Sequence, residues 1–263
     1  MTTSIVDPDT RKRDGRALRD VVPLEDHAHV DTVDRPDPIA LLTAQDATRL
    51  EELVPIRHQR MALTPFSFFR GAAAIMASDL ARVPATGLRV QLCGDAHLSN
   101  FGMFHSPDRR LVFDVNDFDE TLPGSFEWDL KRLAASVTVA GRNNELSGKQ
   151  IRSATRAAVR GYRKGRERPV ALSPLDVHDH RLEVESVLAD SEQLRKRSRK
   201  AIAEATQKDS VRALDKLTEI VDGRRRIVAR PPLVIPLDGH LTGDDGQRLT
   251  EFFAAYRSSL PPH

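Results

Sequence analysis

Alternation between apolar and polar residues marks the extended part of the chain. Residues 88–92 alternate in this way and predict a half-buried strand. Apolar runs at residues 101–104 and 111–113 flank a Ser-Pro-Asp turn and predict a β-hairpin. Acidic segments follow the strand and the hairpin, at residues 93–100 and 114–120. Because the strands of a short hairpin lie side by side, we expect these two segments to meet.

Segments with helical periodicity make up most of the remaining chain. Helices are expected to begin at Asp37-Pro38 and at Thr64-Pro65, where a capping side chain precedes proline. The second of these is expected to run through residue 83, and Gly71 within it indicates a close approach by a neighbouring part of the chain. Further helices are expected at residues 126–142, 147–164 and 244–256, with two more in 175–221 broken near 206–210. Short extended pieces are expected at residues 226–230 and 233–235.

These patterns predict one α+β domain that is mostly helical. Residues 1–16 are polar and rich in Asp and Arg, and we expect them to form a disordered tail. Residues 17–263 would form a single domain, with 55–165 as its core and 166–263 as a helical extension. A chain of 263 residues is long enough to bury a sizeable core.

The composition, 40% apolar and 30% charged, is that of a soluble globular protein. The net charge is only +2, and the arginine-rich runs at 152–164 and 195–200 lack interleaved aromatic residues, which argues against a nucleic-acid partner. The single cysteine, Cys93, excludes an internal disulfide and fits a reducing compartment. We find no apolar leader and no apolar run near the ~20 residues of a membrane span, so we expect a cytoplasmic protein without membrane contact.

The two acidic segments carry the candidate chemistry. If they meet, one pocket gathers the polar side chains of Asp95, His97, Asn100, Asp117 and Asp119. Carboxylate and amide oxygens suit Mg²⁺ or Mn²⁺ that bridges phosphate oxygens. A further carboxylate can orient an attacking hydroxyl or accept its proton. Either segment alone also fits an Asx-rich turn or a solvated acidic loop, whereas two segments at strand ends favour a phosphoryl-transfer site.

Three motifs in this region resemble the catalytic half of aminoglycoside-phosphotransferase-like kinases. They are Gly94-Asp95-x-His97-x-x-Asn100, Asp117-Phe118-Asp119 and Trp128-Asp129-Leu130-Lys131-Arg132-Leu133. The chain from about Asp14 onward also resembles domain-of-unknown-function family 2252, an uncharacterised bacterial family. The stretches that carry this second resemblance are residues 53–57, 65–71, 93–102 and 114–133.

The kinase resemblance implies a kinase-like catalytic lobe, with a small β-hairpin or sheet and surrounding helices. It also implies a role for each motif residue. Asp95 would be the catalytic aspartate. Asn100 and Asp117 would be the metal ligands, with Asp119 as a further ligand or a substrate contact. Asp129 would brace the catalytic loop by accepting backbone hydrogen bonds.

Three further residues bear on this resemblance. His97 matches a histidine that is common in the small-molecule kinases of the group, and we expect it in the catalytic set. Cys93 is a departure, because those kinases often have a histidine there. Arg70, beside two phenylalanines, could bind a nucleotide phosphate or pair with an acid of the pocket. It could equally reach solvent or form a structural ion pair.

The elements that hold nucleotide phosphates in kinases are not found. The chain has no G-x-G-x-x-G and no G-x-x-x-x-G-K-[ST] motif. Members of the resembled family continue past the equivalent of Tyr256 into a glycine-rich segment and a lysine-bearing strand. We therefore expect this chain to lack its nucleotide lobe and to use ATP only if a C-terminal partner chain supplies it. Apolar surface would then be left near Phe68, Phe69 or residues 233–235.

The sequence leaves three functions open. The first is a Mg²⁺- or Mn²⁺-dependent phosphotransferase for an unknown small-molecule or protein substrate, weak or inactive alone. The second is a non-catalytic pseudokinase or one subunit of a split protein. The third is a metal-dependent phosphoesterase, indicated by Gly94-Asp95-Ala96-His97. The earlier-strand Asp-x-His and the Gly-Asn-His blocks that such phosphoesterases use are not found.

Overall fold

Polar caps followed by proline start several helices of the chain. The side chains of Asp7 and Asp37 each accept two backbone hydrogen bonds from the first turn of a helix, in α1 (Pro8–Val21) and α2 (Pro38–Asp46). Thr64 caps α4 (Pro65–Arg70) in the same way. Such caps satisfy N–H groups that have no partner inside the helix, while proline fixes the backbone. The predicted helix starts at Asp37 and Thr64 are confirmed.

The predicted disordered tail, residues 1–16, differs from the structure. Residues 8–16 belong to α1, because Asp7-Pro8 is the same start signal as Asp37-Pro38. Residues 1–6 lie outside the part of the chain that the computed structural model describes, which is residues 7–189, 192–206, 210–237 and 243–260.

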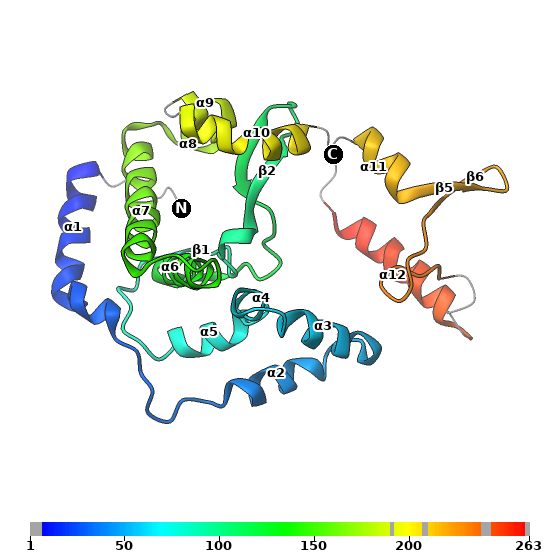
Figure 1. Ribbon diagram of the computed structural model, residues 1–263, viewed down its shortest axis with the longest axis horizontal. Helices are drawn as coiled ribbons and strands as arrows, with labels where there is room; N and C mark the ends of the chain where they lie inside the picture. The colour runs from blue at the N-terminus through cyan, green and yellow to red at the C-terminus, as the bar shows by residue number, and fades with distance from the viewer. Residues whose placement is uncertain (1–6, 190–191, 207–209, 238–242, 261–263) are drawn as a thin grey trace. The chain divides into compact units, whose positions relative to one another are not determined.

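The chain divides into two compact units, Met1–Thr206 and Gln207–His263 (Figure 1). This differs from the single domain predicted for residues 17–263, because the described elements of the second unit pair with one another. The described residues form helices and short strand pairs, which confirms the α+β, mostly helical class. None of the helices in the described part combines the length and apolar character needed to cross a membrane.

The helix predicted to run through residue 83 is in fact two helices. α4 ends at a break around Gly71, and α5 (Ala73–Leu80) follows. Arg57, on α3 (Val54–Met61), donates a 2.9 Å hydrogen bond to the Gly71 carbonyl. A Cβ atom on Gly71 would lie 2.6 Å from Met61 Sδ, so the predicted close approach is confirmed. The core of this region consists of Leu42, Met61, Ala72 and Ile75.

The predicted strand and hairpin are both present. β1 (Arg89–Gln91) pairs antiparallel with β4 (Pro123–Ser125), so that Val90 lies opposite Gly124. β2 (Phe101–His105) pairs antiparallel with β3 (Leu111–Val115) and forms the hairpin. The first acidic segment leaves β1 and the second leaves β3, and η3 (Leu98–Asn100) leads into β2.

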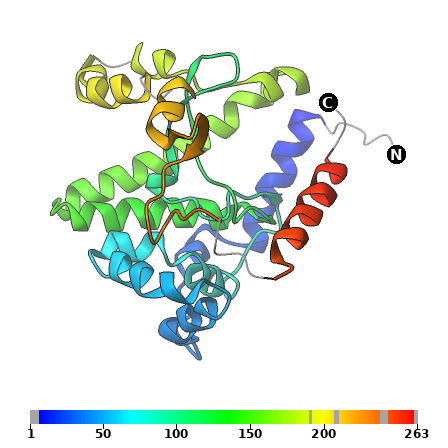
Figure 2. The ribbon, with the colours of Figure 1, turned by 90° about the vertical axis from the view of Figure 1, so that its right-hand side faces the viewer.

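Helix α6 (Phe126–Asn143) occupies the centre of the first unit. It contacts α4, α5 and β1, and it lies against α7 (Gly148–Glu167), to which a short turn joins it (Figures 1 and 2). The helices predicted at 126–142 and 147–164 are therefore confirmed. Short 3₁₀ turns complete this part of the chain, namely η1 (Leu24–Ala28), η2 (Glu51–Leu53) and η4 (Arg168–Ala171).

The part of the first unit that follows η4 packs against the hairpin. It contains α8 (Pro174–Asp179), α9 (Val184–Ala189) and α10 (Glu192–Thr206), and α9 and α10 contact β3 and β2. The sequence predicted two helices over 175–221, whereas the described residues already form three helices by residue 206. The predicted break near 206–210 falls partly on residues 207–209, outside the described residues. A second apolar cluster joins these helices to the hairpin through Leu111, Val184 and Ala205.

The second unit contains α11 (Ser210–Leu217), β5 (Thr218–Val221), β6 (Arg224–Ile227) and α12 (Asp245–Ser259). The predicted final helix is confirmed. The helical prediction up to residue 221 is wrong for β5, because Asp222 and Gly223 both have positive φ and form a tight hairpin turn. The predicted extended piece at 233–235 is not a strand, although Val234 forms an isolated bridge to Arg230.

Substituting Gly94 tests how tightly the loop after β1 is packed. Gly94 has a φ of +86°, and a Cβ atom there would lie 2.0 Å from the Glu120 carbonyl oxygen. We expect Gly94→Ala to lower the free energy of unfolding by about 3 kcal/mol or more, measured by urea unfolding. Gly87 is the matched control, because its φ is +80° and nothing lies within 4 Å. Gly87→Ala should cost about 1–2 kcal/mol, and equal losses for the two variants would contradict the close packing.

Candidate active site

The loop after β1 is held by a carboxylate of α6. Asp129 accepts hydrogen bonds from the backbone N–H of Cys93 (2.7 Å, Oδ2) and of Gly94 (3.1 Å, Oδ1). Ser136, two turns further along α6, accepts a third from Leu98 N–H at 3.1 Å. The N–H groups of Cys93 and Gly94 lie in an irregular segment, and that of Leu98 belongs to the first residue of η3, so the α6 side chains supply acceptors that the local backbone lacks. Asp129 thus accepts backbone hydrogen bonds of the kind that the bracing prediction requires, with Cys93 and Gly94 as the donors.

The side-chain amide of Asn100 joins the two acidic segments. Its Nδ2 donates to the backbone carbonyl of Asp95 (3.0 Å) and to that of Asp117 (2.7 Å). Asn100 is 5% exposed, so the two loops meet over a buried amide. Its Oδ1 accepts no hydrogen bond from the described residues and is not among their fully buried unpaired atoms. The expected meeting of the two segments is therefore observed, and one amide oxygen stays available.

Asp95 forms a buried ion pair that the sequence motifs did not predict. Its Oδ1 accepts a short hydrogen bond from Nε of Arg132, a residue that is 2% exposed. Its Oδ2 lies 3.6 Å from Nε2 of His97. The Asp95 carboxylate therefore lies between a buried cation and a buried imidazole.

Arg132 is held on its other side by α4 and α5. Its Nη2 donates to the Phe69 carbonyl at 3.1 Å, and its guanidinium carbon lies 4.6 Å from the centre of the Phe69 ring. Its Nη1 lies 3.7 Å from Met76 Sδ. These contacts fix the guanidinium group before any ligand binds.

Burial sets the protonation of His97 and Cys93. Burial lowers the pKa of His97, and the nearby cations Arg132 and Arg70 lower it further, while Asp95 opposes them. The imidazole is therefore neutral in the folded protein at pH 7, and its buried Nδ1 has no hydrogen-bond partner in the described chain. Burial also raises the pKa of Cys93, which keeps the thiol protonated. Arg70 is exposed, on the last turn of α4, and acts on the site through its charge.

The predicted metal ligands differ in how far they are buried. Asp117 and Asp119 lie on an exposed loop, and Asp117 Oδ1 is 3.5 Å from the Asp119 backbone nitrogen. Among the described residues, no three Asp, Glu, His or Cys side chains gather closely enough to hold a metal ion. The Asn100 amide oxygen adds one oxygen donor beside the Asp117 loop. So few protein oxygens would hold a divalent ion only weakly.

Comparison with known proteins identifies the family. A family model described as an uncharacterised protein conserved in bacteria, domain-of-unknown-function family 2252, matches residues 49–263. The chain belongs to this family. Searches of the curated proteins and of the solved structures found no match. The resemblance to family 2252 is thereby confirmed. The family match includes every candidate site residue from Arg70 to Arg132 and excludes the segment before residue 49.

Two polar residues of this family 2252 site, Arg132 and Ser136, were not assigned a role from the sequence. Asp129, Arg132 and Ser136 have the spacing i, i+3, i+7, which places them on one face of α6. The sequence pattern assigned the buried face of this helix to its apolar residues. The sequence signal for this polar face was the helical spacing of three polar residues next to a loop with unpaired N–H groups.

Removing the Asp129 carboxylate should loosen the loop. We expect Asp129→Ala to lower the free energy of unfolding by about 1–3 kcal/mol, because the N–H groups of Cys93 and Gly94 lose their acceptors. Glu167→Ala is the control, since it removes only an exposed ion pair with Arg163. Urea unfolding checks both variants, and a loss for Asp129→Ala no larger than the control would contradict the bracing role.

The lowered pKa of His97 predicts a pH dependence of stability. The folded state disfavours the charged imidazole, so between the unfolded pKa of about 6.5 and the lower folded value the unfolded chain binds more protons. Stability is therefore lost as pH falls below about 6.5. Urea unfolding at pH 7.5 and 5.5 should show a larger loss for the wild type than for His97→Gln. The difference should not exceed about 1.4 kcal/mol per pH unit, and identical pH slopes would contradict the assignment.

Proposed function

We propose that this chain carries the catalytic loop of a metal-dependent phosphotransferase of kinase-like fold. The observation that supports the proposal best is the double anchoring of the loop. Asp129 binds the N–H groups just before Asp95, and Asn100 binds the carbonyls of Asp95 and Asp117. Phosphoryl transfer depends mainly on positioning and charge neutralisation, so a rigid loop bearing carboxylates suits it.

In this proposal Asp95 orients the hydroxyl that attacks phosphorus. Its Oδ1 is held by Arg132, which leaves Oδ2, on the side of His97, to accept a hydrogen bond from the hydroxyl. A loose transition state requires little proton transfer from the nucleophile early on, so orientation is the larger contribution.

The proposed metal ligands are Asn100 and Asp117, with Asp119 as a further contact. A bound Mg²⁺ or Mn²⁺ would neutralise phosphate oxygens of ATP. Arg70 is exposed and electrostatically close to His97, so we assign it to the phosphates of the nucleotide. The acceptor substrate, a small molecule or a protein, would approach Asp95 from solvent.

A non-catalytic binding role is the second candidate, and one observation favours it. The Asp95–Arg132 pair is buried, and a carboxylate so occupied can serve structure alone. Release of phosphate from ATP with Mg²⁺, measured at saturating ATP because tight nucleotide binding is not expected, separates the two candidates. A catalytic site should lose about 10²-fold or more in rate with Asp95→Asn. A pseudokinase should show no release above that of buffer, with or without the substitution.

Metal binding tests the proposed ligand set. Calorimetric titration with Mn²⁺ should give weak binding, with a Kd on the order of 0.1–1 mM, because few protein ligands hold the ion. Asp117→Ala should weaken it at least tenfold, and Asp215→Ala, which removes an exposed carboxylate of α11, should leave it unchanged. An Mn²⁺ affinity that is unchanged in Asp117→Ala would contradict the ligand set. With ATP and Mg²⁺ we expect no micromolar binding, because the sequence has no glycine-rich phosphate loop.

A further inference from the structure

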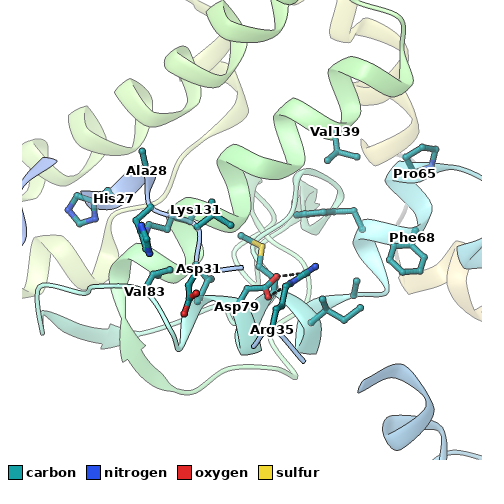
Figure 3. Close-up of a pocket in the computed structure, with 17 residues that line it drawn as sticks. His27, Ala28, Asp31, Arg35, Pro65, Phe68, Asp79, Val83, Lys131 and Val139 are labelled. Carbon is teal, nitrogen blue, oxygen red and sulfur yellow. Dashed lines mark hydrogen bonds and ion pairs between the residues drawn. The ribbon is translucent and has the colours of Figure 1, made fainter. Parts of the chain in front are cut away.

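A separate cavity lies between α4, α5 and α6 and the N-terminal arm, which we define as residues 27–35. Its volume is about 580 Å³, within the ~300–1,000 Å³ typical of small-molecule sites. Its walls are mainly apolar. Figure 3 shows the arm and α4 facing each other across it, with α6 along one side. The principal apolar wall residues are Phe68, Phe69, Ile75, Met76, Leu80 and Val139.

Ion pairs hold the arm over this cavity. Arg35 donates two hydrogen bonds to the Asp79 carboxylate of α5, at 2.7 and 2.8 Å. Arg82 donates to the Asp31 carboxylate at 3.0 Å and to the Asp34 carbonyl at 2.6 Å. The cavity is therefore preformed in the absence of a ligand. Both of its acidic residues, Asp31 and Asp79, already have a cationic partner.

Lys131 is the remaining cation on the wall. It projects from α6 and has no hydrogen bond or ion pair within the described residues. Burial lowers the pKa of Lys131, and the Glu127 carboxylate, one turn earlier on α6, opposes this effect without forming an ion pair. Oε1 of Glu127 accepts hydrogen bonds from the backbone N–H and the hydroxyl of Thr86, and its Oε2 is buried without a hydrogen-bond partner among the described residues. Lys131 therefore lies near one carboxylate without forming an ion pair to it within the described residues, and its ammonium group can bind the anionic group of a ligand.

We propose that the cavity binds a small amphipathic organic acid. The apolar body would lie against the phenylalanines of α4 and the aliphatic side chains of α5, and the carboxylate would bind Lys131. The volume fits a small molecule. This inference is independent of the proposed phosphotransferase function, because its residues bind neither the metal nor the nucleotide there.

The bound acid would also lie close to the candidate active site. Phe69 and Met76 line the cavity, and both contact the guanidinium group of Arg132. Arg132 in turn holds Asp95. Only one layer of side chains therefore separates the proposed ligand from the Asp95–Arg132 pair.

Calorimetric titration of the full chain with decanoate tests the proposal, and decyltrimethylammonium is the probe of opposite charge. We expect saturable binding of one decanoate per chain, and binding of the cation at least tenfold weaker. Lys131→Met should weaken decanoate binding five- to tenfold, while Lys131→Arg should retain it. Lys149→Met is the control, because Lys149 lies on α7 and does not line the cavity.

A second pair of variants tests the location. Ala28 is exposed on η1 and lines the cavity, so Ala28→Trp should obstruct it without disturbing a core and should abolish decanoate binding. Ala62→Trp, at an exposed position outside the cavity, should leave binding unchanged. No saturable binding by the wild type, equal binding of both probes, or decanoate binding unaffected by Ala28→Trp would each overturn the proposal.

Discussion

The buried guanidinium of Arg132 is the interaction on which the first unit depends. It binds the Asp95 carboxylate, the Phe69 carbonyl and the Phe69 ring, and so joins the acidic loop, α4 and α6 through one side chain. A buried cation is tolerated only when its charge and its N–H groups have partners. The positions of α4 and of the loop are thereby tied to each other. The ion pair restricts the arrangement more than apolar packing alone would, since apolar contacts have no preferred direction.

The same helix supplies the other anchors of the loop. Asp129 and Ser136 accept its backbone hydrogen bonds, and the buried amide of Asn100 then fastens the Asp117 segment to it. An irregular segment can stay partly buried only if its backbone groups are paired, and here side chains do the pairing. Because α6 is long and packed on several sides, its side chains hold the loop in a fixed position.

Local signals were enough to predict much of this arrangement. Apolar runs on either side of a turn predicted the hairpin, helical periodicity predicted α6 and α7, and the motif resemblance predicted that Asp129 accepts backbone hydrogen bonds. The sequence could not give features that depend on residues far apart in the chain. The break at Gly71 depends on Arg57, and the pairing of Pro123–Ser125 depends on β1. The cavity depends on an arm, a helix pair and α6 that only the fold brings together.

The Asp95–Arg132 pair bears on both candidate functions through one physical trade-off. The ion pair with Arg132 fixes the orientation of the Asp95 carboxylate and occupies one of its two oxygens. Phosphoryl transfer through a loose transition state needs an oriented hydroxyl and a neutralised phosphate more than it needs a strong base. A buried ion pair at Asp95 is therefore compatible with catalysis, because Oδ1 is held by Arg132 while Oδ2 remains to orient the hydroxyl.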